Sequence, residues 1–284
     1  EALQATCAQT GYAPDAFSDL ATTWLEDFAS DATSHPWEPL ERVALQRELG
    51  RQSDYGRQVS ELPITLYRGE RFYIEYLYWE GSTLIAHDHG FCGAHMPLIG
   101  EELVTRHDFA EKWSENDELA IGRLRTTAAR LIRPGDASPI LSGPDGIHFV
   151  YYVGRPVVSL VVRTYYDKRQ LFPNMSLKAG ISLPLANVED FERSITALKH
   201  LARHAPERFR KTIQARAKTM DLARLWRLFN YLNVTAPDTR PLLAPLLETL
   251  FRRVPTEYHA ALEEGIQEQV TRSELVSLRH RANH

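Results

Sequence analysis

The middle of the chain, from about Leu62 to Phe172, has a series of short strand signals separated by turn signals, and this series constrains the fold most. Between Phe72 and Trp79, aromatic and β-branched side chains alternate with period two, which favours a strand. Further candidate strands are Thr83–His87, Ala94–Ile99, Leu103–His107, Gly122–Ile132, His148–Val153 and Val157–Tyr166. Turn signals lie at Glu80-Gly81, Ile99-Gly100, Arg133-Pro134-Gly135-Asp136, Gly143-Pro144-Asp145-Gly146 and Gly154-Arg155-Pro156. Many short strands with regular turns predict a sandwich or a closed barrel.

Helical patterns flank this region on both sides. Before it, apolar residues recur at steps of three and four, at Phe17, Leu20, Ala21, Trp24, Leu25 and Phe28, and a second helix is expected over Pro39–Gly50. After it, three apolar stripes predict short packed helices: Phe191, Ile195 and Leu198; Leu222, Leu225, Trp226, Phe229 and Leu232; and Leu242, Leu243, Leu246, Leu247 and Leu250. We therefore expect a helical segment over 1–60, a β domain over 61–172 and a C-terminal helical domain over 173–284.

Composition excludes several classes of protein. A formal net charge of −4 over 284 residues argues against a nucleic-acid binder that works by bulk positive charge. No run approaches the ~20 apolar residues that a bilayer demands, so we expect no membrane partner. Two cysteines, Cys7 and Cys92, cannot form a disulfide framework, which favours a reducing compartment, the cytoplasm.

Two histidines separated by one residue are the strongest candidates for metal ligands in the sequence. In a strand, residues two apart point to the same face, so His87 and His89 project together, roughly 6–7 Å apart at the backbone. His148, which follows a tight turn and opens a strand, is the best third ligand, and three imidazoles meeting at one point would bind a metal ion. The alternative is a polar patch of hydrogen-bonded strand histidines. His95 is a candidate fourth ligand if a bulge turns it inward.

These residues resemble the cupin superfamily, whose small β-barrel holds a metal. Gly81, five residues, and then His87-Asp88-His89 match its first motif, and Pro144, Gly146 and His148 represent the second. The chain departs from the pattern with one residue between Gly146 and His148 instead of two, Tyr152 in place of Asn, and Ala94 in place of the ligating Glu. The resemblance implies a cupin barrel with helices before it and a helical domain after it.

The missing Glu makes the chain similar to one cupin subgroup, the thiol dioxygenases: cysteine dioxygenase and its mercaptopropionate relatives. Tyr67-Arg68, the form of both histidine motifs, and Val157-Val158-Ser159-Leu160 fit this subgroup. The resemblance implies that His87, His89 and His148 hold Fe(II), with Ni or Zn able to occupy the same ligands. It further implies that Arg68 binds a substrate carboxylate, unless that side chain forms a surface salt bridge instead.

The last core strand departs from the subgroup. Its alternate positions, Ser, His and Tyr in the family, read Ser159, Val161 and Arg163 here. We expect Ser159 and Arg163 to contact substrate and Arg163 to take a catalytic place, with Arg68 and Arg163 together cradling anionic groups; the alternative is that Arg163 pairs with a protein carboxylate. Tyr151 is expected to supply a hydroxyl near the metal. With Ala94 in place of the cross-linking Cys, no Cys–Tyr cross-link is expected.

Three functional hypotheses follow. The first is a mononuclear non-haem Fe(II) dioxygenase that adds O2 to a small anionic substrate with a thiol group. The second keeps the site but has a non-thiol acid as substrate. The third is a non-catalytic cupin that senses a metal or ligand and signals through the helical domain, whose helices could also form a homodimer.

Overall fold

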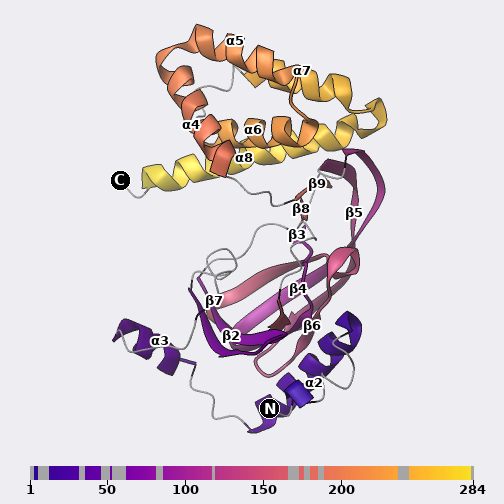
Figure 1. Cartoon of the computed structure of the whole chain (residues 1–284), viewed down its shortest axis with the longest axis vertical. Helices are drawn as coiled ribbons and strands as arrows, with labels where there is room; N and C mark the ends of the chain where they lie inside the picture. The colour runs from indigo at the N-terminus through magenta and orange to yellow at the C-terminus, as the bar shows by residue number, and fades with distance from the viewer. Residues whose placement is uncertain are drawn as a thin grey trace. The chain divides into compact units, whose positions relative to one another are not determined.

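A computed structural model of the chain describes residues 3–5, 13–31, 36–45, 52, 62–80, 86–116, 119–165, 173–175, 180–184, 189–235 and 243–282. The chain forms two compact units (Figure 1). The first unit comprises 1–108 and 125–172, and the second comprises 109–124 and 173–284. None of the described helices is long and apolar enough to cross a membrane.

The first unit is a curved antiparallel sheet with helices beside it. Its strands are β1 (Leu62–Arg68), β2 (Phe72–Trp79), β3 (Ala86–His87), β6 (Ser138–Ile140), β7 (His148–Thr164) and the greater part of β4 (Gly93–Asn116) and β5 (Leu119–Ile132). Strand β7 is central: it pairs with β2, β3 and β4, while β1 extends the sheet beyond β2 and β6 pairs with β4. This arrangement fits the predicted cupin barrel with flanking helices.

The two faces of this sheet explain why β2 reads as an almost continuous run of large side chains. Phe72, Tyr76 and Tyr78 belong to one buried cluster, whereas Leu77 and Trp79 belong to another on the opposite, inner face. Helix α2 (Pro14–Asp31) covers the first face, with Phe17, Ala21 and Leu25 fully buried at helical spacing and the Ser18 hydroxyl donating to the Ile140 carbonyl at 2.8 Å. A strand buried on both faces needs apolar side chains on both.

Two predicted turns do not end their strands. Strand β4 continues through Ile99 and Gly100, and β7 continues through the segment from Gly154 to Pro156. The β4–β7 register shifts on both sides of Ile99, so the glycines mark bulges in a paired ladder. Gly100 has φ +77, and a Cβ there would lie 2.7 Å from Val157 Cγ2, so both conformation and space demand glycine. Glycine is favoured both in a turn that reverses the chain and in a bulge within a strand, so the sequence alone does not distinguish the two.

Other predicted elements are recovered in part. Helix α3 spans Glu38–Ala44 of the expected Pro39–Gly50, and β3 spans Ala86–His87 of the expected Thr83–His87. Gly81 of the first motif, with the rest of that strand, lies outside the described residues. Residues 143–146 form a 3-10 turn, as the turn signal there indicated.

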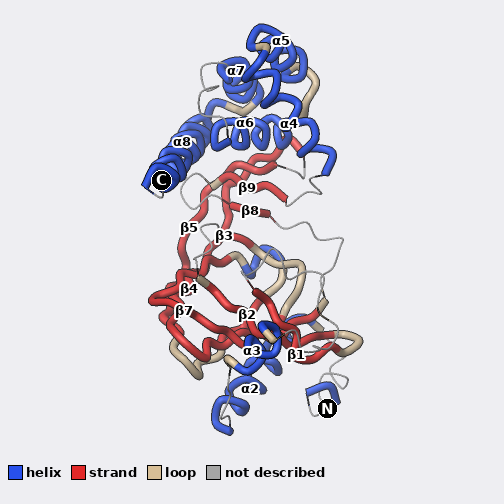
Figure 2. Tube along the Cα trace, turned by 90° about the vertical axis from the view of Figure 1, so that its left-hand side faces the viewer, coloured by secondary structure: helices blue, strands red, loops and turns tan. Residues whose placement is uncertain are grey.

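The second unit is largely a helical bundle (Figure 2, in which all helices are blue). Its helices are α4 (Glu189–His204), α5 (Pro206–Ala217), α6 (Leu222–Thr235), α7 (Ala244–Arg253) and α8 (His259–Ala282), with a short 3-10 turn at Thr256–Tyr258. Strands β8 (Pro173–Met175) and β9 (Ile181–Pro184) also belong to it, and β9 pairs with the start of β5. The predicted α6 stripe is confirmed, since Leu222, Leu225, Trp226, Phe229 and Leu232 are all buried in one core.

Candidate metal centre

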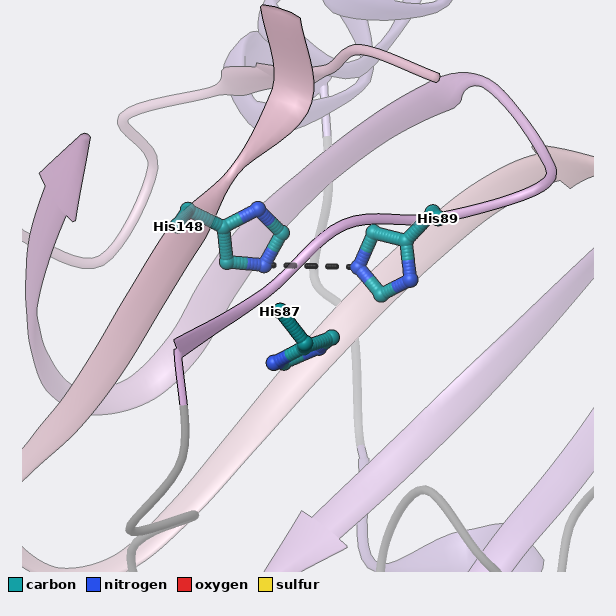
Figure 3. Close-up of side chains that lie close together, drawn as sticks. All are labelled: His87, His89 and His148. Atoms are coloured by element: carbon teal, nitrogen blue, oxygen red, sulfur yellow. Dashed lines mark hydrogen bonds between the residues drawn. The ribbon is translucent and has the colours of Figure 1, made fainter. Parts of the chain in front are cut away.

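Three predicted histidines meet on the inner face of the first unit. His87 in β3 lies opposite His148, the first residue of β7, in the antiparallel ladder, so both side chains point to the same face. His89 follows His87 by two residues and returns to that face. Figure 3 shows the three rings around a common space, with His89 and His148 joined through their Nε2 atoms.

The distances among the rings fit one metal ion. The Nε2 atoms of His89 and His148 are 3.3 Å apart, and one nitrogen from each of the three rings lies within 4.8 Å of the others. Two nitrogens bound to one ion at about 2.0–2.1 Å lie about 3 Å apart, so the first pair already has the separation of two ligands. Rotation about the χ2 torsion of His87, which has a broad energy minimum, can bring its ring nitrogen to the same distance from the ion. Among the described residues no carboxylate joins the cluster.

Hydrogen bonding and burial prepare two of the rings for a cation. His148 Nδ1 lies 2.9 Å from the Gly146 carbonyl, which can only accept, so Nδ1 carries the proton and the Nε2 lone pair faces the other two rings. Burial lowers the pKa of His89 and of His148 well below the ordinary histidine value, and the neighbouring His87 adds to this effect in both. Both imidazoles are therefore neutral at neutral pH, as metal binding requires.

Gly146 holds the backbone in the position that orients His148. A Cβ at this residue would lie 2.0 Å from the Leu141 carbonyl oxygen, so the turn approaches the backbone just after β6 too closely for any side chain. We expect Gly146→Ala to displace the carbonyl that fixes His148, to destabilise the first unit by about 1–3 kcal/mol, and to weaken zinc affinity about 10- to 100-fold. Thermal unfolding and competitive zinc titration measure the two effects.

Gly69→Ala is the matched control for this substitution. A Cβ there would meet only the flexible end of the Tyr67 side chain, with Tyr67 Oη at 2.9 Å. Its zinc affinity should equal that of the unmodified protein. Equal zinc affinity in Gly146→Ala and Gly69→Ala would show that the close approach at Gly146 does not orient His148.

Arg163 lies beside the cluster, but its charge is balanced inside the protein. Its guanidinium pairs with the Glu75 carboxylate, and both side chains are almost fully buried. The same guanidinium lies 4.8 Å from the ring centroid of Phe91, which in turn stacks on His89 at 4.3 Å. The expectation that Arg163 offers a free cation to substrate is therefore corrected. Arg163 pairs with a protein carboxylate, which was the alternative.

Arg68, predicted to bind a substrate carboxylate, is an exposed residue at the end of β1. Its guanidinium donates to the Gln52 carbonyl at 3.2 Å and lies 5.6 Å from the Tyr165 ring centroid. Strand β1 is two strands away from β7, with β2 between them. The structure thus does not bring Arg68 into contact with the three histidines.

Ser159 is buried on the inner face, where it takes part in a polar network. Its hydroxyl donates to Glu102, whose other carboxylate oxygen lies 3.3 Å from His95 Nε2. His95 does turn inward, as the fourth-ligand alternative required, but it faces Glu102 and is not one of the clustered histidines. Burial lowers the pKa of His95, while Glu102 opposes this effect.

Tyr151 does not reach the cluster. His148, Val150 and Tyr152 share the inner face of β7, so Tyr151, three residues from His148, points to the other face. Its side chain is 49% exposed. The hydroxyl expected near the metal is therefore not supplied by this residue.

Sequence reasoning missed four residues of the inner face: Glu75, Phe91, Glu102 and Arg106. Glu75 had a usable signal, because a carboxylate between Tyr73 and Leu77 in an otherwise aromatic strand needs a buried partner. Glu102 and Arg106 lie on β4, whose inward positions become clear only once the register with β7 is known, and Phe91 precedes that strand. His107 is buried, and its two ring nitrogens lie near the hydroxyls of Thr105 and Thr126.

Comparison with known proteins finds structural likeness only. No protein-family model matches the sequence, and neither does any curated protein. The hydroquinone 1,2-dioxygenase of Sphingomonas sp. TTNP3, solved with 4-hydroxybenzoate, is similar with 12% identity and a TM-score of 0.29 over 41% of this chain and 70% of that chain. Hydroquinone 1,2-dioxygenase PnpCD, solved with Cd2+ and 4-hydroxybenzonitrile, has 15% identity and a TM-score of 0.30, covering 51% and 77%.

A cupin-superfamily sugar phosphate isomerase of Silicibacter pomeroyi DSS-3 is similar as well. It has 17% identity and a TM-score of 0.27, covering 43% of this chain and 75% of that chain. Likeness at these levels assigns neither a substrate nor a reaction to the chain.

Proposed function

We propose that this protein is a mononuclear non-haem iron dioxygenase that adds O2 to a small anionic thiol. The observation that carries the proposal is the cluster of His87, His89 and His148, which offers three neutral nitrogens and, among the described residues, no carboxylate. Imidazole suits iron, nickel, copper and zinc alike, so the choice of iron rests on the resemblance to the thiol dioxygenases. Fe(II) held there would supply the redox-active centre that reacts with O2.

The protein's own residues would hold the metal ligands and shape the surroundings. The Gly146 carbonyl fixes the tautomer of His148, and Phe91 packs against His89. Trp79 and Tyr152 stack at 4.8 Å on the same inner face and make part of its wall apolar. Conversion of RSH and O2 to RSO2H balances without another reductant, since both oxygen atoms go to sulfur.

A second candidate keeps the metal site and replaces the thiol with a non-thiol acid. The aromatic wall of Trp79, Phe91 and Tyr152 favours it, because such a surface suits a substrate larger than a two- or three-carbon thiol. The absence of a tyrosine at position 163 is consistent with a different reaction.

O2 uptake by the iron-loaded protein separates these candidates. A panel of small thiol acids, neutral thiols and non-thiol acids should give uptake with thiol acids, with both atoms of labelled O2 recovered in a sulfinate. His87→Ala should give none, because it lacks one of the three ligands. Uptake with non-thiol acids alone would reject the thiol assignment, and bound iron without uptake across the panel would favour a sensing role.

A further inference from the structure

The inner face holds a third arginine, and its position relative to the histidines differs from those of Arg68 and Arg163. Arg106 in β4 lies directly opposite His148 in β7, and His148 lies opposite His87 in β3. The three residues thus form one row across three neighbouring strands and point to the same face. Side chains opposite one another in such a row have Cβ atoms about 4.5–5.5 Å apart, so Arg106 starts beside two of the proposed metal ligands.

Arg106 has no carboxylate partner among the described residues. Its guanidinium donates to the neutral Pro139 carbonyl at 2.8 Å. By contrast, Arg163 is paired with Glu75, and Arg68 lies on exposed β1 against Tyr165. Arg106 is therefore a half-buried arginine beside the histidines that has no carboxylate partner in the described part of the chain.

Electrostatics places this charge close to the site. Arg106 is among the causes that lower the pKa of His148 and that of His95, so its guanidinium lies near both rings. Burial lowers the pKa of Arg106 itself, which means that the half-buried cation lacks full solvation. An anion bound beside it would offset that cost.

Two further polar atoms of the inner face are buried without a hydrogen bond among the described residues, Trp79 Nε1 and His95 Nε2. His95 Nε2 lies 3.3 Å from the Glu102 carboxylate, but without the geometry of a hydrogen bond. His95 is close enough to Arg106 for the two to interact electrostatically. Buried polar groups are almost always satisfied, so these atoms indicate that a polar ligand or water occupies this face in the working protein.

We propose that Arg106 binds the anionic group of the substrate, a carboxylate, beside the three-histidine centre. This inference rests on the proposed metal site and names the residue that would select acids over neutral molecules. A guanidinium fits a carboxylate through two parallel hydrogen bonds. One of its nitrogens is held by the Pro139 carbonyl, which fixes the orientation of the fork. A divalent ion on three neutral imidazoles adds positive potential that favours the same anion.

Binding to the zinc-loaded protein tests the proposal without requiring turnover. The probes are 3-mercaptopropionate and propionate, which carry a carboxylate, and 2-mercaptoethanol, a thiol without one, titrated by calorimetry. Arg106→Met should weaken binding of both acids about 10- to 100-fold, because a charge-assisted pair is lost. It should leave 2-mercaptoethanol affinity unchanged. Arg106→Lys, which keeps the charge, should stay within about tenfold of the unmodified protein for the acids.

Arg130→Met is the matched control. Arg130 is exposed on β5 in the same unit, and the same change of side chain there should alter neither acid nor thiol binding. Zinc per chain and circular dichroism establish that each variant is folded and loaded. If Arg106→Met does not fold, Arg106→Gln replaces it, since an amide can still donate to the Pro139 carbonyl.

Three results would overturn the inference: unchanged acid affinity in the folded Arg106→Met protein, an equal loss for acids and 2-mercaptoethanol, or no acid binding by the unmodified zinc protein. The outcome is separable from that of the oxygenase proposal. Acid binding that depends on Arg106 in a protein that never consumes O2 would reject the dioxygenase and retain this inference. O2 uptake together with an acid affinity that does not depend on Arg106 would support the dioxygenase and reject this inference.

Discussion

Replacing His148 with alanine should lower the affinity for a divalent metal more than a hundredfold. Four ligands give structural zinc about 10–16 kcal/mol, so one ligand contributes roughly 3 kcal/mol, and about 3 kcal/mol exceeds a hundredfold in Kd. His89 and His148 already have the separation of two ligands of one ion, with Nε2 atoms 3.3 Å apart. Competitive zinc titration and iron per purified chain measure the loss.

His200→Ala provides the matched control for this prediction. His200 and His204 are exposed on α4, with their rings stacked at 6.1 Å, and the structure gives them no third ligand among the described residues. This variant should retain full metal content. Undiminished zinc affinity in His148→Ala, in a folded protein, would mean that the three rings do not share an ion, and the proposed oxygen chemistry would lose its basis.

Replacing Arg163 with methionine should destabilise the first unit by about 3–5 kcal/mol, because it leaves a buried carboxylate without its counter-charge. The Glu75 side chain is 0% exposed and its partner 2%. A loss of this size corresponds to a drop in Tm of about 6–20 °C. Thermal or urea unfolding followed by tryptophan fluorescence measures it, with Trp79 reporting from the same face.

The double variant Glu75→Leu/Arg163→Met distinguishes an unpaired charge from lost packing. It removes both charges and should recover most of the stability, since a buried ion pair can be replaced by apolar residues at little cost. Full loss in the double variant would attribute the effect to packing of Arg163 against Tyr73 and Phe91.

The pH dependence of the single variant follows from Glu75. Burial raises the pKa of this carboxyl, and Arg163 opposes the rise, so the substitution pushes the folded-state pKa higher still. A folded state with the higher pKa binds more protons than the unfolded state, and its stability therefore increases as pH falls. Arg163→Met should be closer to the unmodified protein at pH 5 than at pH 8. The opposite trend would contradict a buried, unpaired Glu75.

The sequence was sufficient to predict the cluster of three histidines because their positions follow local rules. His87 and His89 differ by two in a strand, and His148 opens a strand after a turn. The same rule of two should have excluded Tyr151, which differs from His148 by three and so faces away. Tyr151 has a suitable hydroxyl, but its position in the strand turns that hydroxyl away from the histidines.

The remaining features of the site depend on register, which local patterns do not determine. Glu75 and Arg163 are 88 residues apart, and their pairing follows from the alignment of β2 with β7. Likewise, Arg106 joins the histidine row only because β4 resumes its pairing with β7 after the bulges near Ile99 and Gly100. Had the glycine signals been true turns, these strands would have ended there and left Arg106 elsewhere.

The second unit is assembled from two separate stretches of the chain, because 109–124 joins 173–284 while 125–172 belongs to the first unit. A deletion at one terminus therefore cannot excise the bundle cleanly. Truncation after residue 172 would keep 109–124 but strip the partners of Leu119 and Ile121, which lie in the bundle's apolar core. Such a fragment would expose an apolar strand end prone to self-association. Excising the bundle therefore also requires a short turn in place of 109–124.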